Sequence, residues 1–140
     1  MKKIILILMV IYSSFGFDID DFDKGVLYLN NGNFKDAYDI FYEGCELNDE
    51  MSCNELGFMY INKQVTKEID NTVNDKDNIK IGISYIFKSC ELGNINACSD
   101  IIDLKNRFKI DNEVYNKSNK KYEELEQQYL IQDDLNATNY

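Results

Sequence analysis

The chain has 140 residues and a formal net charge of −10, and it contains no histidine, proline or tryptophan. Without histidine it has no imidazole base, no histidine-supported nucleophile and no histidine ligand for a metal. Its acidity disfavours nucleic acids and anionic membrane surfaces as partners. The length suggests one domain, and the absence of proline together with only 7 glycines suits helices.

The first predicted element is a signal peptide over residues 1–16. Met1 is followed by two lysines, residues 4–12 form an apolar run, and small residues stand at positions 14 and 16. This order is typical of a cleaved export signal. An uncleaved membrane anchor is the alternative, but the apolar run is short for spanning a bilayer. We therefore expect a secreted or periplasmic protein without membrane contact after cleavage.

The four cysteines occur in two similar stretches, GCELNDEMSC (residues 44–53) and SCELGNINAC (residues 89–98). A zinc site is one interpretation, but structural zinc sites favour cysteine pairs two to four residues apart. Export to an oxidising compartment favours disulfides. Three connectivities are possible, and the duplicated pattern favours the two local bridges, Cys45–Cys53 and Cys90–Cys98.

A local bridge requires the chain to turn between its two cysteines. Residues eight apart on one continuous helix lie roughly 12 Å apart, whereas a disulfide needs Cα atoms within about 7 Å. Asn48 and Asp49 in the first stretch, and Gly93 and Asn94 in the second, can end one helix and cap the next. Each pair is therefore predicted to clip two antiparallel helices at their shared turn.

The helices beside these turns are predicted from their apolar spacing. When the sequence is aligned with itself so that Asn33 matches Asn78, the apolar positions of two helical hairpins coincide. The first hairpin shows Phe34, Ala37, Phe41 and Cys45, then Cys53, Leu56, Gly57 and Tyr60; the second shows Ile79, Ile83, Ile86 and Cys90, then Cys98, Ile101, Ile102 and Phe108. A sequence period in this range is typical of stacked helical pairs.

Two segments carry a family resemblance. GVLYLNNGNFKDAYDIF (residues 25–41) has Gly25, Tyr28, Ala37 and Phe41 at the spacing of a tetratricopeptide repeat, and GCELNDEMSCNELGFMY (residues 44–60) resembles the cysteine-rich, secreted Sel1-like variant of that repeat. The resemblance covers about residues 18–108. It implies an all-α, TPR/Sel1-like helical-hairpin solenoid in which a disulfide joins the two helices of each repeat.

Two further segments complete the expected repeat domain over residues 17–132, and a tail follows it. Residues 65–77 are polar and lack a helical period, so we expect an exposed insertion. Residues 112–132 place Tyr115, Ser118, Tyr122, Leu125 and Tyr129 on one face, which predicts a C-terminal capping helix for the solenoid. Residues 133–140 are expected to form a disordered tail.

No catalytic motif is readable in the chain. Ser118 and Lys121 fit the Ser-x-x-Lys motif of serine β-lactamases, but its companion motifs are absent and chance explains the match better. The aspartates at positions 20, 21 and 23 lack the spacing of a calcium-binding loop. We expect no metal and no cofactor.

The expected function is an interaction module for a protein or peptide ligand. Tyr38, Tyr42, Tyr60 and Tyr85 could line a concave groove of the solenoid, or they could pack between helices, which we favour for Tyr60. The family resemblance implies a second interpretation, a weak β-lactamase or penicillin-binding protein whose ligand would be a β-lactam or a peptidoglycan fragment. A purely structural secreted protein is a third.

One modification site is predicted in the tail. Asp134, Asn136 and Thr138 form the extended bacterial pattern for N-glycosylation, acidic-x-Asn-x-Ser/Thr, whereas the ordinary sequon needs only Asn-x-Ser/Thr. Asn136 is therefore a candidate acceptor, on the assumption that it lies in a flexible segment. A tail that contains these residues by chance is an equally good interpretation.

Overall fold

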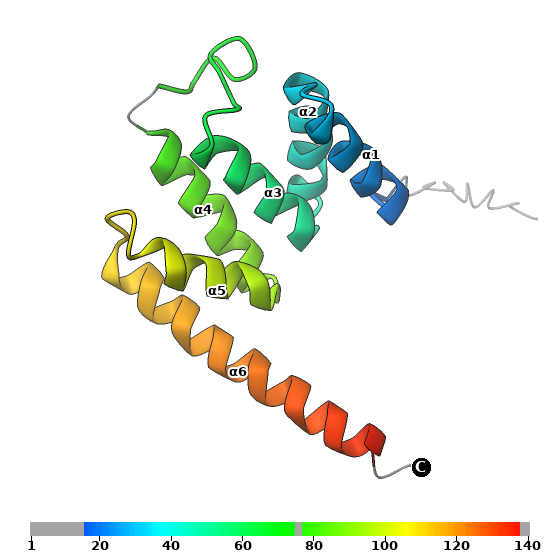
Figure 1. The fold of residues 1–140 in the computed structure, drawn as a ribbon, viewed down its shortest axis with the longest axis vertical. Coiled ribbons are helices and arrows are strands. Elements are labelled where there is room, and N and C mark those ends of the chain that lie inside the picture. The colour runs from blue at the N-terminus through cyan, green and yellow to red at the C-terminus, as the bar shows by residue number, and fades with distance from the viewer. Residues whose placement is uncertain (1–15, 75–76, 138–140) are drawn as a thin grey trace, which may run out of the picture.

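The computed structural model describes residues 16–74 and 77–137, so the predicted signal peptide falls almost entirely outside the described residues. These residues form six α-helices and no strand, which confirms the all-α class (Figure 1). The helices are α1 (Ile19–Asn30), α2 (Phe34–Glu46), α3 (Glu50–Ile61), α4 (Asn78–Glu91), α5 (Ile95–Leu104) and α6 (Asn112–Ala137).

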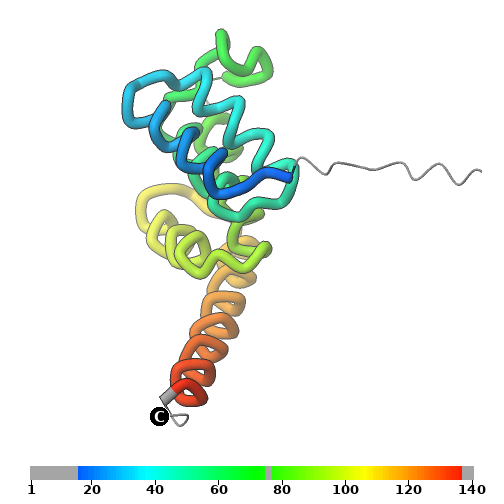
Figure 2. Tube along the Cα trace, turned by 90° about the vertical axis from the view of Figure 1, so that its right-hand side faces the viewer, coloured from blue at the N-terminus to red at the C-terminus, as the bar shows by residue number. Residues whose placement is uncertain are grey.

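Each helix packs against the next one along the chain, and the most extensive contact joins α3 to α4. The long helix α6 packs against α5 and α4 and then continues beyond the body of the molecule (Figure 2). Within the described ranges, no helix has both the length and the apolar character needed to cross a membrane.

The turns between paired helices use the residues that the sequence indicated. Asn48 ends α2 with a φ of 65° and Gly93 ends α4 with a φ of 110°, both in the left-handed region that closes a helix. Asp49 then caps α3 by accepting the amide of Ser52 at 2.7 Å, and Asn94 caps α5 through the amides that follow it. The two predicted helical hairpins are therefore present.

Both local disulfides are formed. Cys45 is bonded to Cys53 and Cys90 to Cys98, with Cα–Cα distances of 4.6 and 4.7 Å. All four cysteines are fully buried, and none has a free thiol. The zinc interpretation is therefore wrong, because no thiolate is left to bind a metal. Two disulfides in one small chain indicate an oxidising compartment.

Helices α3 and α4 touch through their backbones at two glycines. A Cβ atom on Gly57 would lie 2.7 Å from the carbonyl oxygen of Gly82, and a Cβ atom on Gly82 would lie 2.5 Å from the carbonyl oxygen of Gly57. Neither position can hold a side chain at this separation. The side chains around this crossing divide into two apolar cores, one on each side of the α3–α4 contact: Phe41, Cys45, Leu56, Met59 and Tyr60 belong to the first, and Ile83, Ile86, Cys90, Cys98 and Ile101 to the second.

The segment expected to be an exposed insertion is partly buried. Val65 and Val73 are only 1% and 3% exposed and belong to the first core, and Ile69 packs against it. The expectation of full exposure was therefore wrong for these three apolar residues. These three residues are spaced four apart, as on one side of a helix, but the segment forms turns and bends instead. Asp75 and Lys76 in the same segment lie outside the described residues.

The predicted capping helix is longer than expected. Tyr115, Tyr122 and Leu125 pack on the second core, but α6 continues past Gln132 as far as Ala137. The expected disordered tail is therefore helical over residues 133–137, because this polar sequence continues the backbone ladder without needing a packing partner. Asn136 lies in this helix and its side-chain oxygen accepts from Gln132. The flexible setting assumed for glycosylation does not hold there, and Thr138 lies outside the described residues.

Candidate binding surface

Four tyrosines from three helices form a continuous row. Tyr38 and Tyr42 on α2 stack with ring centroids 5.6 Å apart, Tyr38 meets the edge of Tyr60 on α3 at 6.3 Å, and Tyr60 stacks on Tyr85 of α4 at 5.6 Å. The sequence singled out these four residues, and the fold brings all of them together. Aromatic pairs at these distances attract one another beyond the effect of area burial.

The row runs from the core to the surface. Tyr60 is 1% exposed, which confirms that it packs between helices. Tyr38 and Tyr85 are half-buried, and Tyr42 at the end of the row is 41% exposed. The row therefore offers the ring of Tyr42, and parts of two further rings, to a partner, while Tyr60 holds them in place from below.

Asp70 connects the row to the loop after α3. The hydroxyl of Tyr60 donates to Asp70 Oδ2 at 2.7 Å, and Thr72 donates to Asp70 Oδ1 through both its hydroxyl and its amide. Burial acts to raise the pKa of Asp70, but these hydrogen bonds outweigh it and lower that pKa. Residue 70 was not predicted as part of the site, although an aspartate two residues before a threonine is a recognisable turn signal.

The phenols of Tyr38, Tyr60 and Tyr85 stay protonated at neutral pH. Burial is the main cause that raises the pKa of Tyr38, and burial together with the carboxylates of Glu46 and Asp70 raises the pKa of Tyr85 to about 12. Burial also raises the pKa of Tyr60 well above its usual range, and the neighbouring Tyr38 and the hydrogen bond to Asp70 add to this. These three rings are therefore neutral, with carboxylates nearby.

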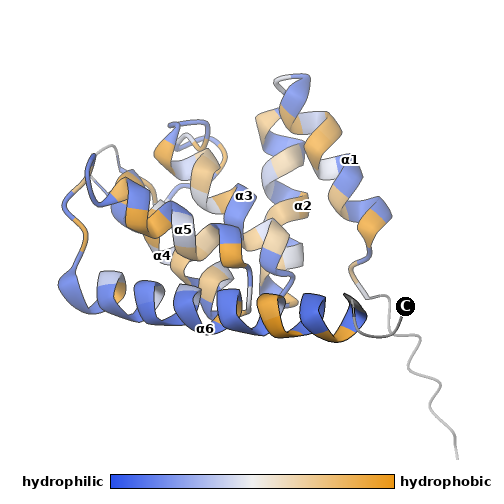
Figure 3. Cartoon of the chain, turned by 60° about the horizontal axis from the view of Figure 1, so that its bottom comes forward, coloured by the Kyte–Doolittle hydropathy of each residue, from blue (hydrophilic) through white to orange (hydrophobic). Residues whose placement is uncertain are grey.

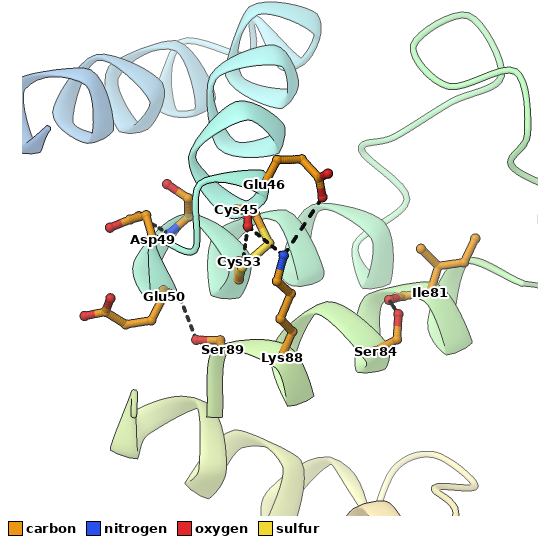
Figure 4. The surroundings of a disulfide bond; sticks show 10 residues. Cys45, Glu46, Asp49, Glu50, Cys53, Ile81, Ser84, Lys88 and Ser89 are labelled. Atoms are coloured by element: carbon orange, nitrogen blue, oxygen red, sulfur yellow. Dashed lines mark hydrogen bonds and ion pairs between the residues drawn. A yellow bond between two sulfur atoms is a disulfide. The ribbon is translucent and has the colours of Figure 1, made fainter. Parts of the chain in front are cut away.

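The end of α4 is anchored on the first disulfide turn (Figure 4). Lys88 Nζ donates to the carbonyl oxygen of Cys45 at 2.7 Å and lies 3.9 Å from a carboxylate oxygen of Glu46, and Ser89 Oγ donates to the carbonyl oxygen of Glu50 at 2.6 Å. These bonds tie α4 to a carbonyl oxygen in the last turn of α2 and to one in the first turn of α3. Lys88 and Ser89 thus fix the second hairpin relative to the first.

The residues considered as catalytic or metal-binding candidates are buried or lie at the start of a helix. Ser118 is fully buried on the side of α6 that packs against the body, so its hydroxyl does not reach solvent. Asp20 and Asp21 lie in the first turn of α1, where Asp21 forms a capping box with Asp18. Among the described residues, no group of three or more acidic or cysteine side chains is arranged to hold a metal ion.

A pair of carboxyl groups, Glu55 and Asp100, lies between α3 and α5. Asn54 on α3 donates to Asp100 on α5 at 3.3 Å, and Glu55 lies next to the same carboxylate. Burial raises the pKa of Glu55, and Asp100 raises it further. Burial also raises the pKa of Asp100, against the opposing hydrogen bond from Asn54. We interpret the pair as a source of pH-dependent stability.

Asp100→Asn is expected to stabilise the protein at pH 7 and to have less effect in mild acid. Because the pKa of Asp100 is raised by folding, the charged carboxylate opposes folding at neutral pH, and this cost disappears as the pH falls through the raised pKa. Asparagine keeps an acceptor for Asn54 and carries no charge. Urea unfolding of both proteins between about pH 4 and 7 measures the difference. The exposed control Glu68→Gln should show no such pH-dependent gain, and an equal gain from both variants would contradict the assignment to Asp100.

No family model matches the chain, and neither a curated protein nor a solved structure matches it. The Sel1-like resemblance therefore rests on the motifs of this chain alone.

Proposed function

We propose that this protein is a secreted or periplasmic interaction module that binds a protein or peptide segment on its tyrosine row. The observation that carries the proposal is the row itself, which combines a partly exposed edge with a buried support. Tyrosine is enriched in the energetically dominant positions of interfaces, because it supplies a large rigid contact area and a hydroxyl.

The proposed architecture supports this function. We infer that the two clipped hairpins are Sel1-like repeats of a helical solenoid. Tyr38, Tyr42 and Tyr85 then all come from the first helices of their hairpins, α2 and α4. Solenoids of stacked helical pairs bind ligands along an extended concave surface, and a row that crosses from one repeat to the next suits an extended segment.

The charges around the row favour a partner segment that carries lysine or arginine. Asp39, Glu46 and Asp70 all lie close enough to shift the pKa of a tyrosine in the row. Lys35 pairs with Asp39, and Lys88 lies near Glu46, but the chain as a whole carries a net charge of −10. A cation placed over a neutral tyrosine ring is attracted by the ring face as well as by the carboxylates.

The test is selection of displayed peptides on the oxidised protein, followed by affinity measurement with variants. Tyr42→Ser and Tyr85→Ser are expected to weaken the binding of selected peptides about tenfold or more, as for central interface tyrosines. Tyr129→Ser, which removes an exposed tyrosine on α6 outside the row, should leave the affinity unchanged. Peptides that bind all three variants alike would contradict the tyrosine row as the site.

A nitrocefin assay on the same protein distinguishes this function from β-lactam hydrolysis. The buried position of Ser118 offers no exposed nucleophile, so we expect no turnover above the uncatalysed rate. Sustained turnover by pure protein that is lost in Ser118→Ala would overturn the proposed function.

A further inference from the structure

An apolar groove lies on the opposite side of α4 from the tyrosine row, between α4 and the loop that leads into α6. Its volume is about 460 Å³. Six apolar side chains line it, Ile79, Ile83 and Phe87 from α4 and Phe108, Ile110 and Val114 from the loop and the start of α6. A groove of this size and character can accept several aliphatic side chains of a partner.

The rim of this groove is basic in an otherwise acidic protein. Lys80 and Lys109 both line it, both are exposed, and within the described part of the chain neither forms an ion pair. The carboxylate of Asp111, which also lines the groove, already accepts the amide of Glu113 at the start of α6. The groove therefore suits a ligand that has an apolar side and negative charge beside it.

The far end of α6 has this combination. Leu130 and Ile131 are 61% and 60% exposed, and Figure 3 shows apolar residues along this end of the helix. Asp134 follows Leu130 by one helical turn and Ile131 by three positions, so the three side chains share one side of the helix. Asp133 adds a second negative charge next to this side.

The groove cannot be filled by the α6 end of its own chain. Val114 lines the groove from the first turn of α6, and a straight helix places Ile131 roughly 25 Å further along at 1.5 Å per residue. Figures 1 and 2 show α6 as one straight helix that leads away from α4. The apolar end of α6 and the apolar groove can therefore meet only between two molecules.

We propose that the protein associates head to tail, with the end of α6 from one copy seated in the α4–α6 groove of the next. Leu130 and Ile131 enter the apolar groove, and Asp133 and Asp134 face Lys80 and Lys109 on its rim. The two contacting surfaces are different, so the association is heterologous and can continue from copy to copy. A contact of this size belongs to the weak, concentration-dependent class.

Sedimentation velocity of the oxidised, full-length protein from about 10 μM to 1 mM tests the association. We expect the mean mass to rise steadily with concentration. Two double variants each remove one half of the contact. The helix-end variant carries Leu130→Gln and Ile131→Gln, and the rim variant carries Lys80→Glu and Lys109→Glu. Each variant alters only exposed side chains, and each should weaken self-association at least tenfold with an unchanged circular dichroism spectrum.

A mixture of the two variants gives the decisive result. The helix-end variant keeps an intact groove and the rim variant keeps an intact helix end, so together they should form a 1:1 complex that grows no further. The matched control Leu27→Gln removes exposed apolar surface on α1 and should associate like the wild type. A wild-type protein that is monomeric throughout, or a mixture that stays monomeric, would overturn the proposal. If two α6 ends paired with each other instead, the rim variant alone would associate like the wild type, which would also overturn the proposal.

Discussion

Gly57→Ala is expected to lower the free energy of unfolding by about 2 kcal/mol. The new methyl group would lie 2.5 Å from Cγ1 of Ile86 and 2.7 Å from the carbonyl oxygen of Gly82, so α3 and α4 must move apart. Overpacking of this kind typically costs about 1–3 kcal/mol, and two close contacts on the neighbouring helix place the cost at the upper end. Alanine returns about 1 kcal/mol as a better helix former.

Gly82→Ala should have a similar effect, and the double variant should cost less than the sum of the two. The first alanine already separates the two helices, so part of the space that the second methyl group needs is open before it is introduced. Urea unfolding gives the three values. Ser84→Ala, an exposed position on α4, is the control and should be neutral or slightly stabilising. If either glycine variant matched this control, the backbone contact between α3 and α4 would be refuted.

Removing one disulfide is expected to lower the free energy of unfolding by about 2.5 kcal/mol, and removing both by about 5 kcal/mol. These values follow from the entropy that a short closed loop removes from the unfolded chain. Small domains are commonly stable by only about 5–15 kcal/mol in total. The protein without both bridges should therefore be partly or largely unfolded at physiological temperature.

The comparison between the two bridges is informative, because both have a sequence separation of 8. The loop entropy is then equal for the two bridges. One double variant carries Cys45→Ala and Cys53→Ala, and the other carries Cys90→Ala and Cys98→Ala. A difference in stability between them reports on the surroundings of each bridge. The first turn also receives Lys88 at the carbonyl oxygen of Cys45, so we expect the first hairpin to keep its geometry better without its bridge. Thermal unfolding of the oxidised variants measures this. Unchanged stability in both variants would mean that the bridges do not support the fold.

Local signals in the sequence determined the helices and their turns. The left-handed residues Asn48 and Gly93 and the caps Asp49 and Asn94 act within a few residues of themselves, so their roles follow from the chain alone. The disulfide pairing follows for the same reason, because each pair of cysteines stands across one turn. The four tyrosines could also be named as candidates, because a helical solenoid presents a concave surface that such residues can line.

The tertiary structure decided every feature that depends on contact between distant segments. Gly57 and Gly82 become a helix crossing only when α3 meets α4, and Val65 and Val73 become core residues only when the loop folds back onto the first hairpin. Whether a tyrosine supports the row or forms its exposed edge depends on the neighbouring helices. Apolar periodicity records which face of a helix is buried, but it does not record which other segment covers that face, because the covering residues come from elsewhere in the chain.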